Sequence, residues 1–127
     1  MSETLPPPSP SDAARMLAVV PWADRLRAGR MKPPIGLIKN DVRSLQELEL
    51  LLEPAPSTLP GLDFASAAAW VETTIGDAAL ASAMREEAAR GASYVDRCLG
   101  LHVIVRQRVT QVREAAATPE ALAEKEA

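Results

Sequence analysis

The chain has 127 residues, which is the size of one domain, and its formal net charge is −3. Hydrophobic residues make up 47% of the chain, but 23 of them are alanine, and Leu, Ile, Val and Phe together number only 29. The core must therefore be small and closely packed. The mildly acidic charge argues against a dedicated nucleic-acid-binding domain, which is usually basic. The single cysteine excludes an internal disulfide framework and suits a reducing compartment.

Segments that would direct the chain to a membrane are not apparent. No run of 18 apolar residues occurs, and residues 1–5 lack the basic start and apolar stretch of a secretory signal. Arginine outnumbers lysine by 11 to 3, and this bias together with the alanine content is typical of a GC-rich genome. We expect a protein of the bacterial cytoplasm that does not contact a membrane.

Proline and charge divide the chain into three parts. Residues 1–10 hold four prolines and are expected to form a flexible arm, because proline cannot donate a backbone hydrogen bond. Residues 11–117 are expected to form a single helical domain. Residues 118–127 are predicted to form a charged tail, which is either a frayed helix or without regular structure.

Within the domain, the first predicted helix starts after Ser11 as its N-cap and runs to Val20, where Pro21 stops it. A second short helical stretch is expected over 22–28. Residues 29–43 contain two glycines and two prolines, so they are predicted to be a connector on the surface.

Two further helices follow with clearer signals at their ends. Ser44 and Glu47 have the spacing of a capping box, and the leucines that follow recur every three or four residues until Pro54. The next helix is predicted to begin at Asp63 and to end at Gly76, which supplies a left-handed stop.

The C-terminal segment carries the longest pattern. From Ala81 to Ala116 one residue in every three or four is apolar or small, which matches five heptads and predicts one long helix over about 78–116. The alternative is a break at Gly91, where Ser93 and Asp96 could cap a new helix. The unbroken register favours the single helix. A strand over 101–105 is disfavoured because the alternation of apolar and polar residues fails on both sides. The predicted fold class is all-α, with short helices packed along the long one.

Cys98 and His102 stand four residues apart, so a helix places them on one face, at a spacing that can bind a soft metal or haem. The chain has no other Cys or His to complete such a site. Core packing is the preferred interpretation of the cysteine. We expect no cofactor, and a metal- or haem-binding bundle is the weakest of the alternatives.

Motifs of catalysis are missing from the sequence. The serines lack the glycine-flanked elbow of a hydrolase, and the six glycines are scattered singly and so form no phosphate-binding loop. The adjacent carboxylates are expected to be solvated and unsuited to acid–base catalysis. We therefore expect a protein that is not an enzyme.

The apolar stripe of the long helix is longer than the short helices can cover, and uncovered apolar surface marks a protein contact. We expect an adaptor, assembly factor or accessory subunit that binds a protein partner or another copy of itself. The residues assigned to this surface are Val95, Leu99, His102, Val105, Val109 and Val112, flanked by Arg106, Arg108 and Arg113, with Trp22 in a second docking surface.

The arginines of the long helix also predict a contact within the chain. The helix opened by Ser44 carries Glu47, Glu49 and Glu53, so we expect it to pack against residues 95–113.

A regulatory nucleic-acid-binding protein is the alternative from another class. Residues 1–43 carry seven positive and four negative charges, and the positive ones concentrate in 25–43. Such a basic segment can contact phosphates. Trp22 is the only aromatic residue beside it, so stacking on single strands has little support.

Overall fold

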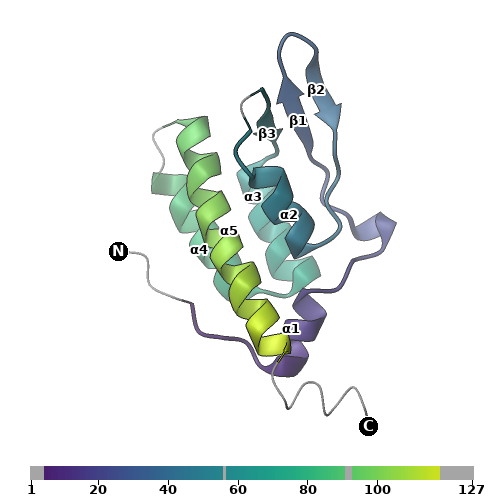
Figure 1. Ribbon diagram of the computed structural model, residues 1–127, viewed down its shortest axis with the longest axis vertical. Coiled ribbons are helices and arrows are strands. Elements are labelled where there is room, and N and C mark those ends of the chain that lie inside the picture. The colour runs from purple at the N-terminus through teal and green to yellow at the C-terminus, as the bar shows by residue number, and fades with distance from the viewer. Residues whose placement is uncertain (1–4, 56, 91–92, 118–127) are drawn as a thin grey trace.

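The computed structural model describes residues 5–55, 57–90 and 93–117 and shows five α-helices with a small antiparallel sheet (Figure 1). The fold is therefore mixed α and β, and the predicted all-α class is wrong. The helices are α1 (Pro10–Met16), α2 (Leu45–Leu52), α3 (Phe64–Trp70), α4 (Ala78–Arg90) and α5 (Tyr94–Ala116). The strands are β1 (Gly29–Lys32), β2 (Gly36–Lys39) and β3 (Leu59–Gly61), a 3-10 turn spans Trp22–Asp24, and a π turn spans Val71–Ile75.

The sheet arises in the segment predicted to be a connector. β1 and β2 form an antiparallel hairpin, and β3 joins the other edge of β1, which gives the order β2-β1-β3. Pro33 and Pro34 lie in the turn rather than in a strand, and Gly36 has a φ of 102°. A side chain at Gly29 would lie 2.6 Å from the Ile38 carbonyl oxygen, so the close approach of β1 and β2 requires glycine there.

The single helix predicted over 78–116 is two helices. α4 ends at Arg90, and α5 begins after Ser93, whose hydroxyl accepts a hydrogen bond of 3.1 Å from the Asp96 N–H. Gly91 itself lies outside the described residues. The two helices pack against each other, so apolar residues of both become buried, which a continuous rod could not achieve. The capping alternative at Ser93 is thus the correct one.

Local signals at the other helix ends are largely confirmed. Ser44 accepts from the Glu47 N–H at 3.1 Å, and Asp63 accepts from the Ser66 N–H at 3.0 Å. Gly76 has a φ of 85° and ends the π turn in the left-handed conformation. The first helix is shorter than predicted, and it is capped by Ser9 rather than Ser11.

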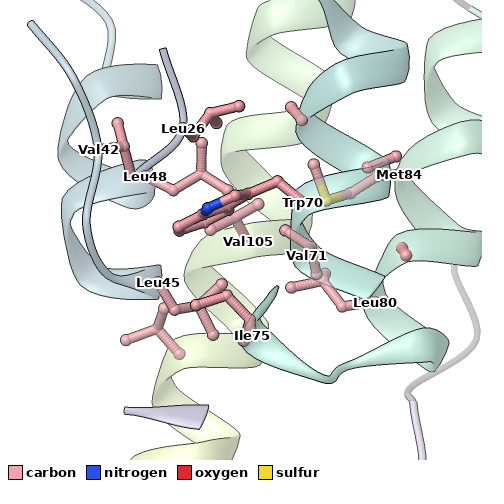
Figure 2. Packing of buried hydrophobic residues seen from close by; sticks show 14 of the residues in the cluster. Leu26, Val42, Leu45, Leu48, Trp70, Val71, Ile75, Leu80, Met84 and Val105 are labelled. Atoms are coloured by element: carbon pink, nitrogen blue, oxygen red, sulfur yellow. The ribbon is translucent and has the colours of Figure 1, made fainter. Parts of the chain in front are cut away.

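The core gathers around α5, which packs against α1, α2 and α4 (Figures 1 and 2). Residues 101–105 are helical, and Leu101 and Val105 are fully buried in this core, so the disfavoured strand is absent there. The largest fully buried side chains besides these two are Leu45, Leu48, Leu51, Leu52, Ile75, Leu80 and Met84. Within the described residues, no helix is long and apolar enough to cross a membrane.

The described part of the predicted arm runs along α5. Gln111 donates through Nε2 to the Leu5 carbonyl at 2.5 Å, and Arg108 donates through Nη1 to the Pro6 carbonyl at 2.8 Å. Residues 1–4 and the predicted tail over 118–127 lie outside the described residues.

Candidate interaction surface

The residues predicted as an interface on the C-terminal helix divide between two sides of α5. Val105, Val109 and Val112 face the core and are at most 1% exposed, so a partner cannot reach them in the folded chain. Val95 and Leu99 lie on the other side with 44% and 43% of their surface exposed. A heptad pattern does not distinguish residues that pack in the core from residues that contact a partner, so it predicts one exposed stripe where the structure has two sides.

Arg108 is the clearest departure from its predicted place beside the exposed stripe. Its side chain is 3% exposed and forms an ion pair with Asp77, whose side chain is 1% exposed. Nε donates to Asp77 Oδ2 at 2.7 Å, and Nη2 donates to Oδ1 at 3.0 Å. Asp77 also caps α4 by accepting from the Leu80 N–H at 3.1 Å. Arg108 thus holds α4 and α5 together and is not available to a partner.

Five of the predicted residues remain together on the accessible side of α5: Val95, Leu99, His102, Arg106 and Arg113. At 3.6 residues per turn, they lie within about 60° of one another around the helix axis. Val103, which the sequence analysis did not select, is 52% exposed and extends the apolar part of this side. We call these six residues the α5 surface.

A groove of about 340 Å³ lies between α2 and α5 beside this surface. It is lined by Gln46, Glu49, Leu50 and Glu53 of α2 and its C-cap, and by His102, Arg106 and Arg113 of α5. The predicted packing of α2 on α5 is therefore confirmed. In the described part of the chain, no ion pair within 4.0 Å joins the α2 glutamates to Arg106 or Arg113, so these charges stay open to a partner.

Cys98 and His102, the pair considered for a metal, lie in different environments. Cys98 is buried, and this burial raises the pKa of its thiol above the usual value, against a smaller opposing effect of a hydrogen bond with Tyr94. His102 is half-buried and lines the groove. Among the described residues, no three Cys, His, Asp or Glu side chains gather where they could hold a metal ion.

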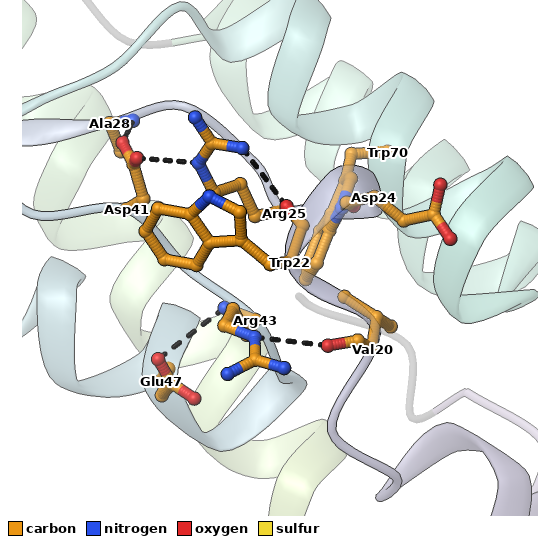
Figure 3. Close-up of polar contacts among 9 residues, drawn as sticks. All are labelled: Val20, Trp22, Asp24, Arg25, Ala28, Asp41, Arg43, Glu47 and Trp70. Carbon is orange, nitrogen blue, oxygen red and sulfur yellow. Dashed lines mark hydrogen bonds and ion pairs between the residues drawn. The ribbon is translucent and has the colours of Figure 1, made fainter.

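Trp22 lies away from the α5 surface; it is exposed itself and lies beside two half-buried arginines (Figure 3). The Arg25 guanidinium lies 4.1 Å from the centre of the indole ring, and that of Arg43 lies 5.9 Å away. Asp41 fixes Arg25 by accepting from its Nε at 2.8 Å. The role of Asp41 is not apparent from the sequence, because it depends on the hairpin that brings residue 41 back beside residue 25.

Half of the basic side chains in residues 25–43 form hydrogen bonds within the fold. Arg25 bonds to Asp41, Arg30 donates to the Leu50 carbonyl at 2.7 Å, and Arg43 donates to the Val20 carbonyl at 3.0 Å. Of the six basic side chains in this stretch, Arg27, Lys32 and Lys39 are the exposed ones. The nucleic-acid hypothesis stays a prediction and relies on these three cations.

The Asp41–Arg25 pair predicts a response to acid. The hydrogen bond from Arg25 holds the pKa of Asp41 below its ordinary value of 3.8, and the Ala28 N–H adds to this effect. A lowered folded-state pKa stabilises the fold above pH 3.8, and that stabilisation is lost as the pH falls through the folded-state pKa. We expect Trp22 fluorescence and the Ala28 amide shift to change together below about pH 4. The Asp41→Asn variant should lack this transition, and an unchanged transition in that variant would contradict the assignment.

Comparisons with models of known protein families, with curated proteins and with solved structures find no match. The function must therefore be argued from the surfaces described above.

Proposed function

We propose that this chain is a non-enzymatic interaction protein, such as an adaptor, assembly factor or accessory subunit, whose partner binds along the α5 surface. The observation that carries the proposal is the run of Val95, Leu99 and Val103, which succeed one another at four-residue spacing and are each exposed by more than 40%. Clustered apolar side chains on a soluble surface are typical of protein contacts. Leu50 of α2, 57% exposed, lies at the adjoining groove.

The form of the surface favours a helix as the partner. Val95, Leu99 and Val103 follow one another one turn apart on α5, beside a groove whose lining is polar except for Leu50. An apolar row next to a polar groove between two helices suits the apolar and polar sides of an amphipathic helix. We infer a partner helix with apolar residues at four-residue spacing for Val95, Leu99 and Val103. Acidic residues on that helix would meet Arg106 and Arg113, and basic residues would meet Glu49 and Glu53 across the groove. Such pairing adds to the rate and specificity of association.

A second copy of the chain fits this surface less well. A parallel pairing of two α5 helices would bring Arg106 and Arg113 of both copies near one another, and like charges at an interface are costly. We place the interaction in the cytoplasm, which suits a chain with a single cysteine and so without an internal disulfide.

The proposal is tested by affinity purification with three variants of the tagged full chain. Leu99→Glu puts a charge in the apolar run, and Arg106→Glu reverses a charge beside it. Ser82→Glu, on the exposed side of α4, is the matched control because it adds a charge away from the surface. We expect one protein to be retained by the wild type and by Ser82→Glu and to be lost by at least tenfold with each α5 variant.

Two outcomes would contradict the proposal. Equal retention of that protein by all variants would place its binding elsewhere. If light scattering finds that the pure wild type is a dimer and that Leu99→Glu dissociates it, the partner at the α5 surface is a second copy of the chain and not a helix of another protein.

A further inference from the structure

The hairpin strand β2 forms an open edge of the sheet. In the order β2-β1-β3, β2 has a neighbour on one side only among residues 5–55, 57–90 and 93–117, and all four of its residues are exposed. Uncovered edge strands are templates for another strand, and folds usually protect them with prolines, bulges, short strands or charged side chains. Of these devices β2 has its short length and Lys39, whose charge repels a basic strand but attracts an acidic one. β2 contains neither proline nor a residue bulged from its register with β1.

The register identifies which backbone groups of β2 point outward. Leu26 and Val42 exchange two hydrogen bonds, of 2.8 and 2.9 Å, at the base of the hairpin. Because hydrogen-bonded and non-bonded pairs alternate in an antiparallel ladder, Arg30–Ile38 is a bonded pair and Met31–Leu37 is not. The N–H and C=O groups of Leu37 therefore point away from β1, and those of Lys39 do the same.

The side chains at this edge continue an apolar row. Leu59, Met31 and Leu37 are paired across the three strands and so share one face of the sheet. Leu37 lies over two glycines, since a Cβ at Gly29 or Gly61 would be within 3.0 Å of its Cδ1 atom. Nevertheless, 65% of Leu37 remains exposed. An added strand would place its own side chain beside Leu37 and cover it.

The charges around the edge select the kind of strand. Lys39 stands two residues after Leu37 on the same face, and Lys32 and Arg27 are also exposed on the hairpin. A second copy of β2 would bring two basic hairpins together, and like charges directly opposite are destabilising. An acidic strand is complementary to them.

We propose that β2 binds an extended, acidic segment of another protein by strand addition, with an apolar residue beside Leu37 and a carboxylate beside Lys39. Main-chain hydrogen bonds to Leu37 and Lys39 supply part of the affinity, and the side chains supply the selectivity. This contact extends the interaction role of the chain, but it uses neither the α5 surface nor the groove, so either proposal can fail alone.

The test uses a fluorescent peptide with the sequence Thr-Val-Thr-Glu repeated twice, titrated with the full chain. Its valines and glutamates share one face when the peptide is extended. We expect backbone amide shifts confined to residues 29–39, and binding that weakens with salt. A peptide with lysine in place of glutamate should bind at least tenfold more weakly.

Two variants at one position separate strand addition from simple apolar contact. Leu37→Ala shortens the side chain and keeps the N–H, whereas Leu37→Pro also removes the outward N–H, which β1 does not use. We expect Leu37→Pro to bind at least tenfold more weakly than Leu37→Ala, while both retain the wild-type melting curve. The Leu99→Glu variant of the α5 surface should bind the peptide normally.

Three results would overturn the proposal. Equal affinity of the two Leu37 variants would exclude strand addition, and equal affinity for the lysine peptide would exclude an acidic partner. A dimer of the pure chain that Leu37→Pro dissociates would show that a second copy, rather than a foreign strand, occupies the edge.

Discussion

Replacing Asp77 with alanine is expected to lower the free energy of unfolding by about 3–5 kcal/mol, because it leaves the Arg108 guanidinium buried without its counter-ion. The two side chains are 1% and 3% exposed and share two hydrogen bonds, of 2.7 and 3.0 Å. The substitution also removes the cap that the Leu80 N–H bonds at the start of α4. Urea denaturation followed by circular dichroism measures the loss.

The double variant Asp77→Ala with Arg108→Met is the informative control. It removes the uncompensated charge, so we expect it to be more stable than Asp77→Ala alone, although Arg108 also bonds to the Pro6 carbonyl and to Gln111. A loss below about 1 kcal/mol in Asp77→Ala, the size seen for exposed pairs, would mean that water reaches the pair.

Replacing Trp70 with alanine is expected to cost about 3–5 kcal/mol of unfolding free energy, because the substitution empties the centre of a small core. Trp70 is 7% exposed and lies beside Leu48 of α2 and Val105 of α5 (Figure 2). The cavity cannot collapse easily, since α2 and α5 are packed on each other around it. The same denaturation experiment measures the effect.

Trp70→Phe separates packing from hydrogen bonding. The indole Nε1 donates to the Asp24 carbonyl at 2.7 Å and so fastens the 3-10 turn that carries Trp22 (Figure 3). Phenylalanine keeps most of the apolar contact but releases this turn, so we expect a smaller loss of stability together with a changed chemical shift of the Trp22 indole N–H. An indole shift identical to that of Trp22 in the native chain would show that the turn is held by other contacts.

The helix ends could be predicted because their causes lie within four residues. The side chains of Ser44 and Asp63 meet backbone N–H groups three positions later, and Gly76 tolerates a positive φ that other residues resist. The break before α5 has the same local cause at Ser93. The apolar repeat runs on through this break and therefore predicts a single helix, although the cap at Ser93 marks a new start.

The third strand of the sheet and the buried ion pair could not be predicted because their causes are distant in the chain. The β1–β2 hairpin is local, but two of the four β1 residues, Arg30 and Lys32, are charged, and β3 pairs with β1 from some thirty residues later. The heptad position of Arg108 predicts a surface residue, but in the fold Arg108 is buried and paired with Asp77. For the α5 surface, the apolar periodicity predicts the correct helix. Which residues of α5 stay exposed depends on the packing of α2 against it, which the periodicity does not show.

The central place of α5 has a consequence for the order of folding. Three helices lie against it, and the carbonyls of residues 5 and 6 are bonded to side chains more than 100 positions later. A nascent chain synthesised only through α4 has no element on which α1 and α2 can complete their burial. We therefore expect native structure to form late, after α5 has left the ribosome, with the apolar sides of the earlier helices exposed until then.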